Sequence, residues 1–164
     1  MRLSDFDIDF IKFKNESESF KFKLDDTFFK LKEGSLYSSC DIVVDLNCSK
    51  NDSTINLDYT LQGVVNTNCD RCLDDIAIEI NANFSNVLKL TAKDDLLAEE
   101  NYLSINHQIY SVYDSLYEQI CLNMPAKRTC ENSLKNVECE LNYQTEEVEK
   151  PVDERWNELK KLLK

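Results

Sequence analysis

Two cysteines stand at the C-x-x-C spacing in the stretch NTNCDRCLDD, residues 66–75. Thiols at this spacing can form a redox pair, or they can occupy adjacent corners of a tetrahedral metal site. A redox pair uses a helix N-terminus to lower its thiol pKa. Cys69 and Cys72 instead fall at a predicted hairpin tip beside three aspartates, whose charges oppose the thiolate form. The sequence therefore favours half of a metal site, and a turn that merely contains thiols is the alternative.

The other half of such a site must come from elsewhere in the chain. Cys130 and Cys139 are the best candidates, because they lie in a polar segment that would gain from being tied to the rest of the fold. Cys40 and Cys48 are weaker candidates, since Cys48 shares the alternation of a strand face. Four thiolates would bind one Zn²⁺. The alternative is that all seven cysteines are reduced and free of metal.

The N-terminal sequence and the cysteine number indicate the compartment. Residues 1–10 read MRLSDFDIDF, with three acids where a secretory leader needs an apolar run. No window approaches the roughly 18 apolar residues of a membrane span. We therefore expect a soluble, cytoplasmic protein with a single domain over residues 1–164. Thiols stay reduced in that compartment, so an odd number of cysteines argues against a disulfide framework.

Charge is distributed unevenly along the chain. The net charge is −12, which opposes binding to nucleic acid. Residues 1–124 hold 11 basic and 22 acidic side chains, whereas residues 125–164 hold 8 and 9. Any phosphate contact is therefore expected from the C-terminal quarter, where Lys127 and Arg128 are adjacent, unless these are only solvated surface charges. Arg71 is the one basic residue in its turn, where it would serve binding or fix the turn through a local ion pair.

Apolar residues recur at every second position through the first half of the chain, which is typical of strands with one buried face in an antiparallel sheet. The alternating segments cover residues 6–10, 20–24, 42–48, 55–61 and 76–84. The stretch DDTFFKLKEGS interrupts them and predicts a short helix, with Asp25 or Asp26 as its N-cap and Gly34 as its stop.

The period changes to that of a helix near residue 105. Apolar residues from Ile109 to Cys121 share one face of a helix that must end before Pro125. Cys121 lies on that face and is expected to be a small buried hydrophobe. Residues 125–151 are polar and irregular, and residues 152–164 predict a C-terminal helix.

These patterns together predict an α+β fold. At least five antiparallel strands between residues 6 and 90 should form a sheet or partial barrel, packed against one central helix near residues 108–123. The short early helix and the C-terminal helix would complete it.

The sequence shows no catalytic constellation. It has no glycine-rich phosphate loop, and its one histidine, His107, leaves no Ser-His or Cys-His system. We expect His107 to face solvent or to cap a helix. The sequence therefore predicts a protein that is not an enzyme. A thiol- or metal-dependent enzyme that uses Cys69 and Cys72 is the alternative, and it would need a thiol that reacts at neutral pH.

Three stretches follow one another along the chain: CDRCL at residues 69–73 after LDYTLQGVV, then INHQIYSVYDSLYEQICLNMPAKR, and then VDERWNELKKL. In this order they resemble the YceD family of large ribosomal RNA subunit accumulation proteins, over about residues 20–164. The chain departs from the family at Glu154, where proline usually opens the last helix, and it lacks the second C-x-x-C of the most cysteine-rich members. Family members carry Cys or His five residues after the proline, and Cys130 stands at that position, which suits a zinc ligand.

The resemblance implies a bacterial or organellar ribosome-biogenesis factor without enzymatic activity. Such a factor supports accumulation of large-subunit ribosomal RNA by binding pre-ribosomal RNA, a ribosomal protein, or both. An acidic body holds a basic ribosomal protein more easily than it holds naked RNA.

Overall fold

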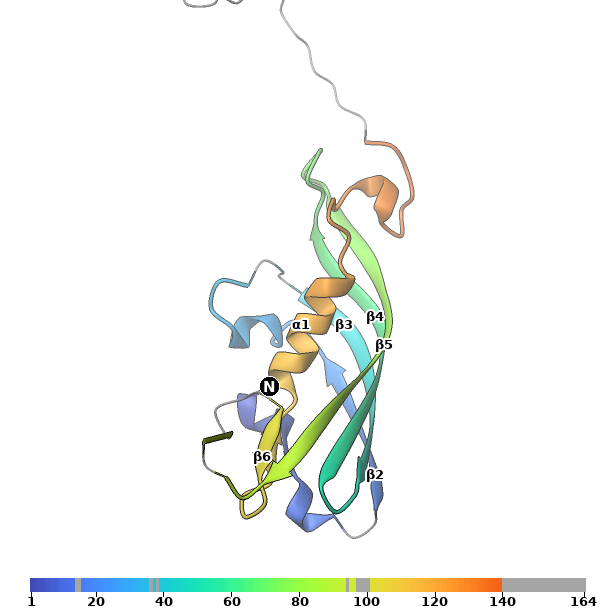
Figure 1. The fold of residues 1–164 in the computed structure, drawn as a ribbon. Helices are drawn as coiled ribbons and strands as arrows, with labels where there is room; N and C mark the ends of the chain where they lie inside the picture. The colour runs from blue at the N-terminus through green and yellow to red at the C-terminus, as the bar shows by residue number, and fades with distance from the viewer. Residues whose placement is uncertain (14–15, 36, 38, 94, 97–100, 140–164) are drawn as a thin grey trace, which may run out of the picture.

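The computed structural model describes residues 1–13, 16–35, 37, 39–93, 95–96 and 101–139. Its main element is a five-stranded sheet with the strand order β2-β3-β4-β5-β6, which curves around one α-helix (Figure 1). A second sheet pairs two short strands, β1 and β7. The elements are β1 (Asp7–Asp9), β2 (Ser17–Leu24), β3 (Ser39–Lys50), β4 (Thr54–Asn68), β5 (Asp75–Thr91), β6 (Tyr102–Ser104), β7 (Ile109–Ser111) and α1 (Tyr113–Asn123).

The long strands confirm the alternation seen in the sequence. Along β3, β4 and β5 nearly every second side chain is buried and the residues between them are mostly exposed or half-buried. The β3–β4 pairing runs from Ser39 opposite Asn66 to Lys50 opposite Ile55. The β4–β5 pairing runs without a bulge from Thr54 opposite Lys89 to Asn68 opposite Asp75. The prediction of a mostly antiparallel sheet is therefore confirmed, with the β5–β6 pair as a parallel exception.

The helix α1 covers the inner face of the sheet (Figure 1). Two of its own residues, Leu116 and Ile120, are completely buried. At its first turn, the ring of Tyr113 lies 5.5 Å from that of Phe6 and 5.0 Å from that of Phe28, measured between centroids. These aromatic contacts hold the helix against two segments from the start of the chain. No helix in the described part of the chain is long and apolar enough to cross a membrane.

The central helix begins later than the sequence predicts. Residues near 108 were expected to open it, but Ile109 belongs to β7, which pairs antiparallel with β1. The backbone N–H of Val112 donates to the carbonyl of Phe6, so α1 follows directly after this pairing. Ile109 has the spacing expected of a helix, but its side chain is 41% exposed. Pairing of its backbone with the distant strand β1 outweighs the local helical periodicity. β1 is correspondingly shorter than the predicted segment 6–10, with a 3₁₀ turn on each side.

The predicted early helix is wrong. Only the 3₁₀ turn Phe29–Leu31 forms there, although Asp25 caps the preceding turn by accepting from the N–H of Thr27. Phe28 and Phe29 are both buried. Phe28 contacts the rings of Phe6 and Tyr113, and Phe29 contacts that of Tyr37, so packing against distant segments outweighs the local helical pattern. The predicted C-terminal helix, residues 152–164, lies outside the described residues.

Gly63 lets β3 and β4 approach closely. It stands opposite Ile42 in the register, with a φ of +156°. A Cβ at this position would clash with the carbonyl oxygen of Asp41 and would lie 2.6 Å from the Cα of Ile42. Both neighbours are backbone atoms, so the contact can be relieved only by moving a strand. Gly34 has a φ of +76°, but an added Cβ there would meet nothing within 4 Å.

We predict that Gly63→Ala lowers the free energy of unfolding by about 2 kcal/mol or more, because the added methyl forces two paired strands apart. Gly34→Ala is the matched control, and its positive φ alone should cost about 1 kcal/mol. Urea denaturation of both variants measures the difference. Equal losses for the two variants would contradict the close approach of β3 and β4.

Candidate metal centre

The turn between β4 and β5, residues 69–74, is held by backbone hydrogen bonds and is called the tip turn below. The N–H of Cys69 donates to the carbonyl of Asp74 over 2.8 Å, and the N–H of Leu73 donates to the carbonyl of Cys69 over 3.0 Å. Leu73 has a φ of 65°, which is uncommon for a bulky residue, and its side chain is 75% exposed. This backbone path turns both cysteine side chains of the tip turn toward the same point.

The segment after α1, residues 125–139, carries the other two cysteines and is called the tip loop. Cys130 opens the 3₁₀ turn Cys130–Asn132, and the hydroxyl of Ser133 donates to its carbonyl over 2.8 Å. The N–H of Leu134 then donates to the carbonyl of Ala77 in β5 over 2.9 Å. The tip loop is therefore docked on the sheet beside the tip turn (Figure 1).

Four sulfur atoms meet between the tip turn and the tip loop. The Sγ atoms of Cys69 and Cys139 lie 3.5 Å apart, and those of Cys72 and Cys130 lie 3.4 Å apart. All four sulfurs fall within 4.8 Å of one another. Cys69 is fully buried and Cys130 is 3% exposed. The structure thus brings together the four cysteines that the sequence singled out, and we call them the cysteine cluster.

The cysteine cluster fits a zinc ion in both donor type and spacing. Sulfurs at the corners of a tetrahedron with a Zn–S distance of about 2.3 Å lie about 3.8 Å apart. The observed separations of 3.4 Å, 3.5 Å and up to 4.8 Å bracket that value. Four protein ligands leave no open position, which is typical of structural zinc sites.

Backbone donors already favour a thiolate at one corner. The N–H groups of Cys72 and Arg71 lie 3.5 Å and 3.4 Å from the Sγ of Cys69. They lower the pKa of Cys69 to about 6, despite its burial. A hydrogen bond with Cys72, together with burial, raises the pKa of Cys130 to about 12. The expectation that nearby aspartates would oppose the thiolate form is therefore wrong for Cys69, because these N–H groups stabilise its thiolate and lower its pKa.

An ion pair joins the tip turn to the tip loop. The Nη2 of Arg128 lies 2.7 Å from the Oδ1 of Asp70, and its backbone N–H donates to the same carboxylate over 2.8 Å. In return, the N–H of Asp70 donates to the carbonyl of Arg128 over 2.7 Å. The guanidinium lowers the pKa of Asp70. Arg128 therefore holds the tip turn to the tip loop, and the prediction that it contacts a partner stays a prediction.

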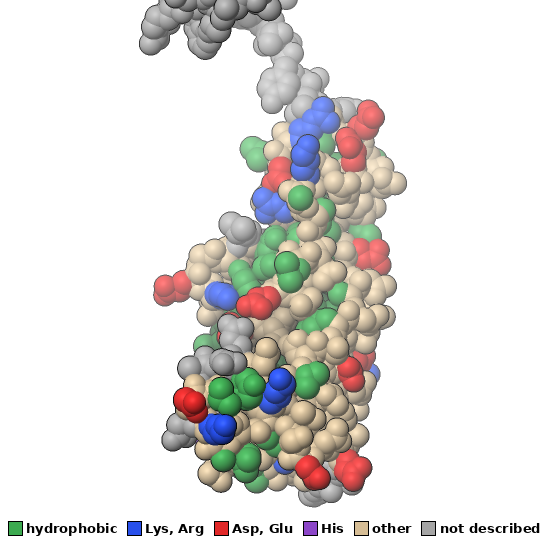
Figure 2. All heavy atoms as spheres, viewed as in Figure 1, with side chains coloured by type: hydrophobic (Ala, Val, Ile, Leu, Met, Phe, Trp, Pro, Cys, Tyr) green, Lys and Arg blue, Asp and Glu red, His purple; other side chains and the backbone are tan. Residues whose placement is uncertain are grey.

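The other two predicted binding residues differ in their surroundings. Arg71 forms an ion pair with Glu131 over 3.5 Å, and both side chains are half exposed. Lys127 is exposed and makes no ion pair with any residue the structure describes. Figure 2 shows basic and acidic side chains side by side at this end of the molecule.

The remaining cysteines and His107 lie outside the cysteine cluster. Cys40 and Cys48 are buried in β3, and burial raises the pKa of each to about 12. Cys121 is half-buried on α1, and burial raises its pKa as well. His107 is exposed, as the sequence predicts. None of these side chains joins a group of metal-binding type among the described residues.

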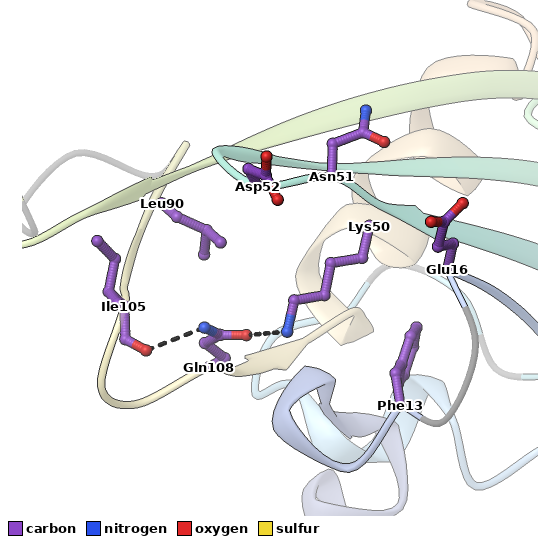
Figure 3. Close-up of a pocket in the computed structure, with 8 residues that line it drawn as sticks. All are labelled: Phe13, Glu16, Lys50, Asn51, Asp52, Leu90, Ile105 and Gln108. Carbon is purple, nitrogen blue, oxygen red and sulfur yellow. Dashed lines mark hydrogen bonds between the residues drawn. The ribbon is translucent and has the colours of Figure 1, made fainter.

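A hollow at the opposite end of the sheet offers no chemistry of this kind (Figure 3). The ammonium of Lys50 donates to the Oε1 of Gln108 over 2.7 Å and to the carbonyl of Phe10 over 2.9 Å. The amide of Gln108 donates in turn to the carbonyl of Ile105 over 2.9 Å. These bonds engage Lys50 and Gln108 in internal contacts, and the remaining polar residues that line the hollow are Glu16, Asn51 and Asp52.

Sequence reasoning missed the contact between Asp70 and Arg128. A signal was present, because Asp70 follows one cysteine directly and Arg128 precedes another by two positions. Asp70 and Arg128 have opposite charges and each lies close to a cysteine pair. They would therefore be expected to form an ion pair if the two cysteine pairs came together. Nothing in the sequence fixed the distance between the pairs.

Comparison with known proteins gives one family match. The family model described as "Large ribosomal RNA subunit accumulation protein YceD" matches residues 57–163, which include the whole cysteine cluster. No curated protein and no solved structure matches the chain.

We predict that Asp70→Ala weakens metal binding by about tenfold, because it removes the acceptor that joins the tip turn to Arg128. Arg71→Ala is the matched control. Its exposed ion pair joins the same two segments by a single contact, so the loss should stay below about twofold. Titration with Co²⁺, followed by thiolate absorption, measures both affinities. A loss for Arg71→Ala as large as for Asp70→Ala would contradict the assignment.

Proposed function

This chain belongs to the YceD family of large ribosomal RNA subunit accumulation proteins, and on that premise we propose that it is a non-enzymatic ribosome-biogenesis factor. It acts in the bacterial cytoplasm by binding a ribosomal protein of the large subunit, and the cysteine cluster holds one zinc ion that fixes the tip. The observation that carries the zinc part of the proposal is the meeting of four cysteine sulfurs within 4.8 Å.

The geometry of the cysteine cluster supports a structural role for the metal. Two ligands come from the tip turn and two from the tip loop, which are separated by 58 residues between Cys72 and Cys130. An ion bound by both segments would connect the tip loop, which follows α1, to the end of the β4–β5 hairpin. The sheet buries its own core, so the domain should keep much of its fold without metal, unlike a small zinc finger.

Burial argues against a thiol enzyme. Cys69 has the lowered pKa that a nucleophile needs, but it is fully buried. Cys72 is the only member of its pair with partial exposure, and its sulfur contacts Cys130 and the carboxylate of Asp74. A substrate could therefore not reach the more acidic thiol. A zinc ion at this point would occupy all four sulfurs and remove the nucleophile entirely.

Charge favours a basic protein over naked RNA as the partner. The net charge is −12, and the tip engages Arg71 and Arg128 in internal ion pairs. Of the three predicted binding residues, Lys127 is the one that is exposed and forms no ion pair with a described residue. A negative surface raises the rate at which a cationic ribosomal protein associates, whereas it repels phosphates. Pre-ribosomal RNA remains the second candidate because of Lys127.

We predict that protein purified from its native cell carries about one zinc per chain and that Cys69→Ser loses it. Elemental analysis measures the content. Binding must displace a proton from Cys130, whose pKa is about 12, so affinity should rise with pH. Cys48→Ser, a buried cysteine outside the cysteine cluster, is the control and should keep the metal. Metal-free native protein would contradict the zinc site.

We predict that pull-down from the native cell recovers a basic large-subunit ribosomal protein, and that nuclease treatment leaves this association intact. Raised salt should weaken it, because the attraction is electrostatic. Lys127→Ala should leave recovery unchanged, as should Lys21→Ala on the distant strand β2. Recovery that needs intact RNA and falls with Lys127→Ala alone would instead identify pre-ribosomal RNA as the partner.

A further inference from the structure

One edge of the main sheet, called the open edge below, has no pairing partner over part of its length among the residues that the structure describes. β5 pairs with β6 only from Lys89 to Thr91. The N–H of Lys89 points to Asn101, and the carbonyl of Ala77 accepts from Leu134. Both residues direct their backbone groups away from β4, so the odd-numbered residues between them do the same. The outward backbone groups of Glu79, Asn81, Asn83, Ser85 and Val87 have no hydrogen-bond partner in the described part of the chain.

The open edge lacks the features that normally protect an edge strand. Residues 79–87 read EINANFSNV, in which Glu79 at one end is the only charged residue and there is no proline or glycine. The opposite edge of the same sheet, β2, carries Lys21 and Lys23, whose side chains are 79% and 73% exposed. Charged side chains, above all lysine, keep other chains from pairing with an edge. β2 is therefore protected, whereas β5 presents a free template for one more strand.

The length of the open edge selects the kind of strand that fits. It spans residues 79–87, which corresponds to about 30 Å of extended chain. Leu134 of the tip loop closes one end, and β6 closes the other. The β5 of a second copy has 17 residues and would run into both obstructions. A short extended segment fits between them without displacing either.

The charges beside the open edge select the composition of that segment. Glu79 lies at one end of the open edge. Asp58 on β4 stands opposite Ser85, six positions further along the edge, and is exposed on the same outer face. On the helix side, Ser115 accepts from the amide of Asn86, and the exposed Glu118 lines the same hollow as Ser115. None of these three acids forms an ion pair with a described residue. The chain's own segment after the tip loop, residues 140–164, holds seven acidic and five basic side chains, so its net negative charge makes it a poorer match for these acids than a basic segment.

We propose that the open edge of β5, residues 79–87, binds a short basic segment of a partner protein as an added strand. Backbone hydrogen bonds supply the attachment, and the acids on either side select lysine and arginine. The inference rests on the proposed function, because it names the surface on which a basic ribosomal protein would be held.

The test uses the full-length protein and a nine-residue probe peptide of alternating lysine and valine with blocked ends. Binding should protect the backbone amides of Asn81, Asn83 and Ser85 from hydrogen exchange, and raised salt should weaken it. Asn83→Pro removes one outward N–H without breaking a bond to β4, so the protein should fold and bind the peptide about tenfold more weakly or worse. Asn83→Ala keeps the N–H and should bind within about twofold of the unmodified protein.

Three results would overturn the proposal. They are equal binding by Asn83→Pro and Asn83→Ala, protection at amides away from residues 79–87, and protection of the open edge before the peptide is added. The last result would mean that the chain itself or a second copy already covers the edge.

The pull-down separates this proposal from the proposed function. If Asn83→Pro still recovers the ribosomal protein, the proposed function stands and the edge proposal fails. If the peptide protects the edge but no ribosomal protein is recovered from cells, the edge binds basic strands and the proposed function fails.

Discussion

The uninterrupted pairing of β4 with β5 is the interaction on which the rest of the structure depends. Its register runs from Thr54 opposite Lys89 to Asn68 opposite Asp75 without a bulge. That regularity keeps one set of alternate side chains facing α1 along the whole hairpin, so the core is continuous. It also determines which backbone groups of β5 point away from β4, and it carries the tip turn at its end. A slip of one residue would move the core face, the open edge and Cys69 together.

The sequence predicts the parts of the fold that depend on local period and fails where distant partners decide. Alternation through residues 42–84 identified three long strands, because a half-buried sheet imposes a period of two on every strand. Ile109 had equally good helical spacing but lies in β7, since β1 offered it a partner across the chain. The parallel pairing of β6 with β5 had no local signal. Phe28 and Phe29 were read as part of a helix, although neither can leave the core.

The candidate site divides in the same way. Chemistry singled out the four cysteines that meet in the structure, because a C-x-x-C turn supplies two ligands and needs two more from a segment with little core of its own. Their distance could not be obtained from the sequence, since it depends on how α1 crosses the sheet and where the tip loop lands on Ala77. The same docking decides the roles of the basic residues. Arg128 joins the tip turn to the tip loop through Asp70, a contact that the sequence did not predict.

The two cysteine pairs are far apart along the chain, so they become available to bind a metal at different times during synthesis. Cys72 and Cys130 are 58 residues apart, and synthesis at roughly 5 to 20 residues per second places about 3 to 12 seconds between them. β2 to β5, the four long strands of the sheet, have all been synthesised by then, so the sheet can begin to assemble before the second ligand pair exists. A chain that ended prematurely before Cys130 would carry these strands but could not close its tip. Closure of the tip therefore distinguishes a chain translated through Cys139 from a shorter fragment.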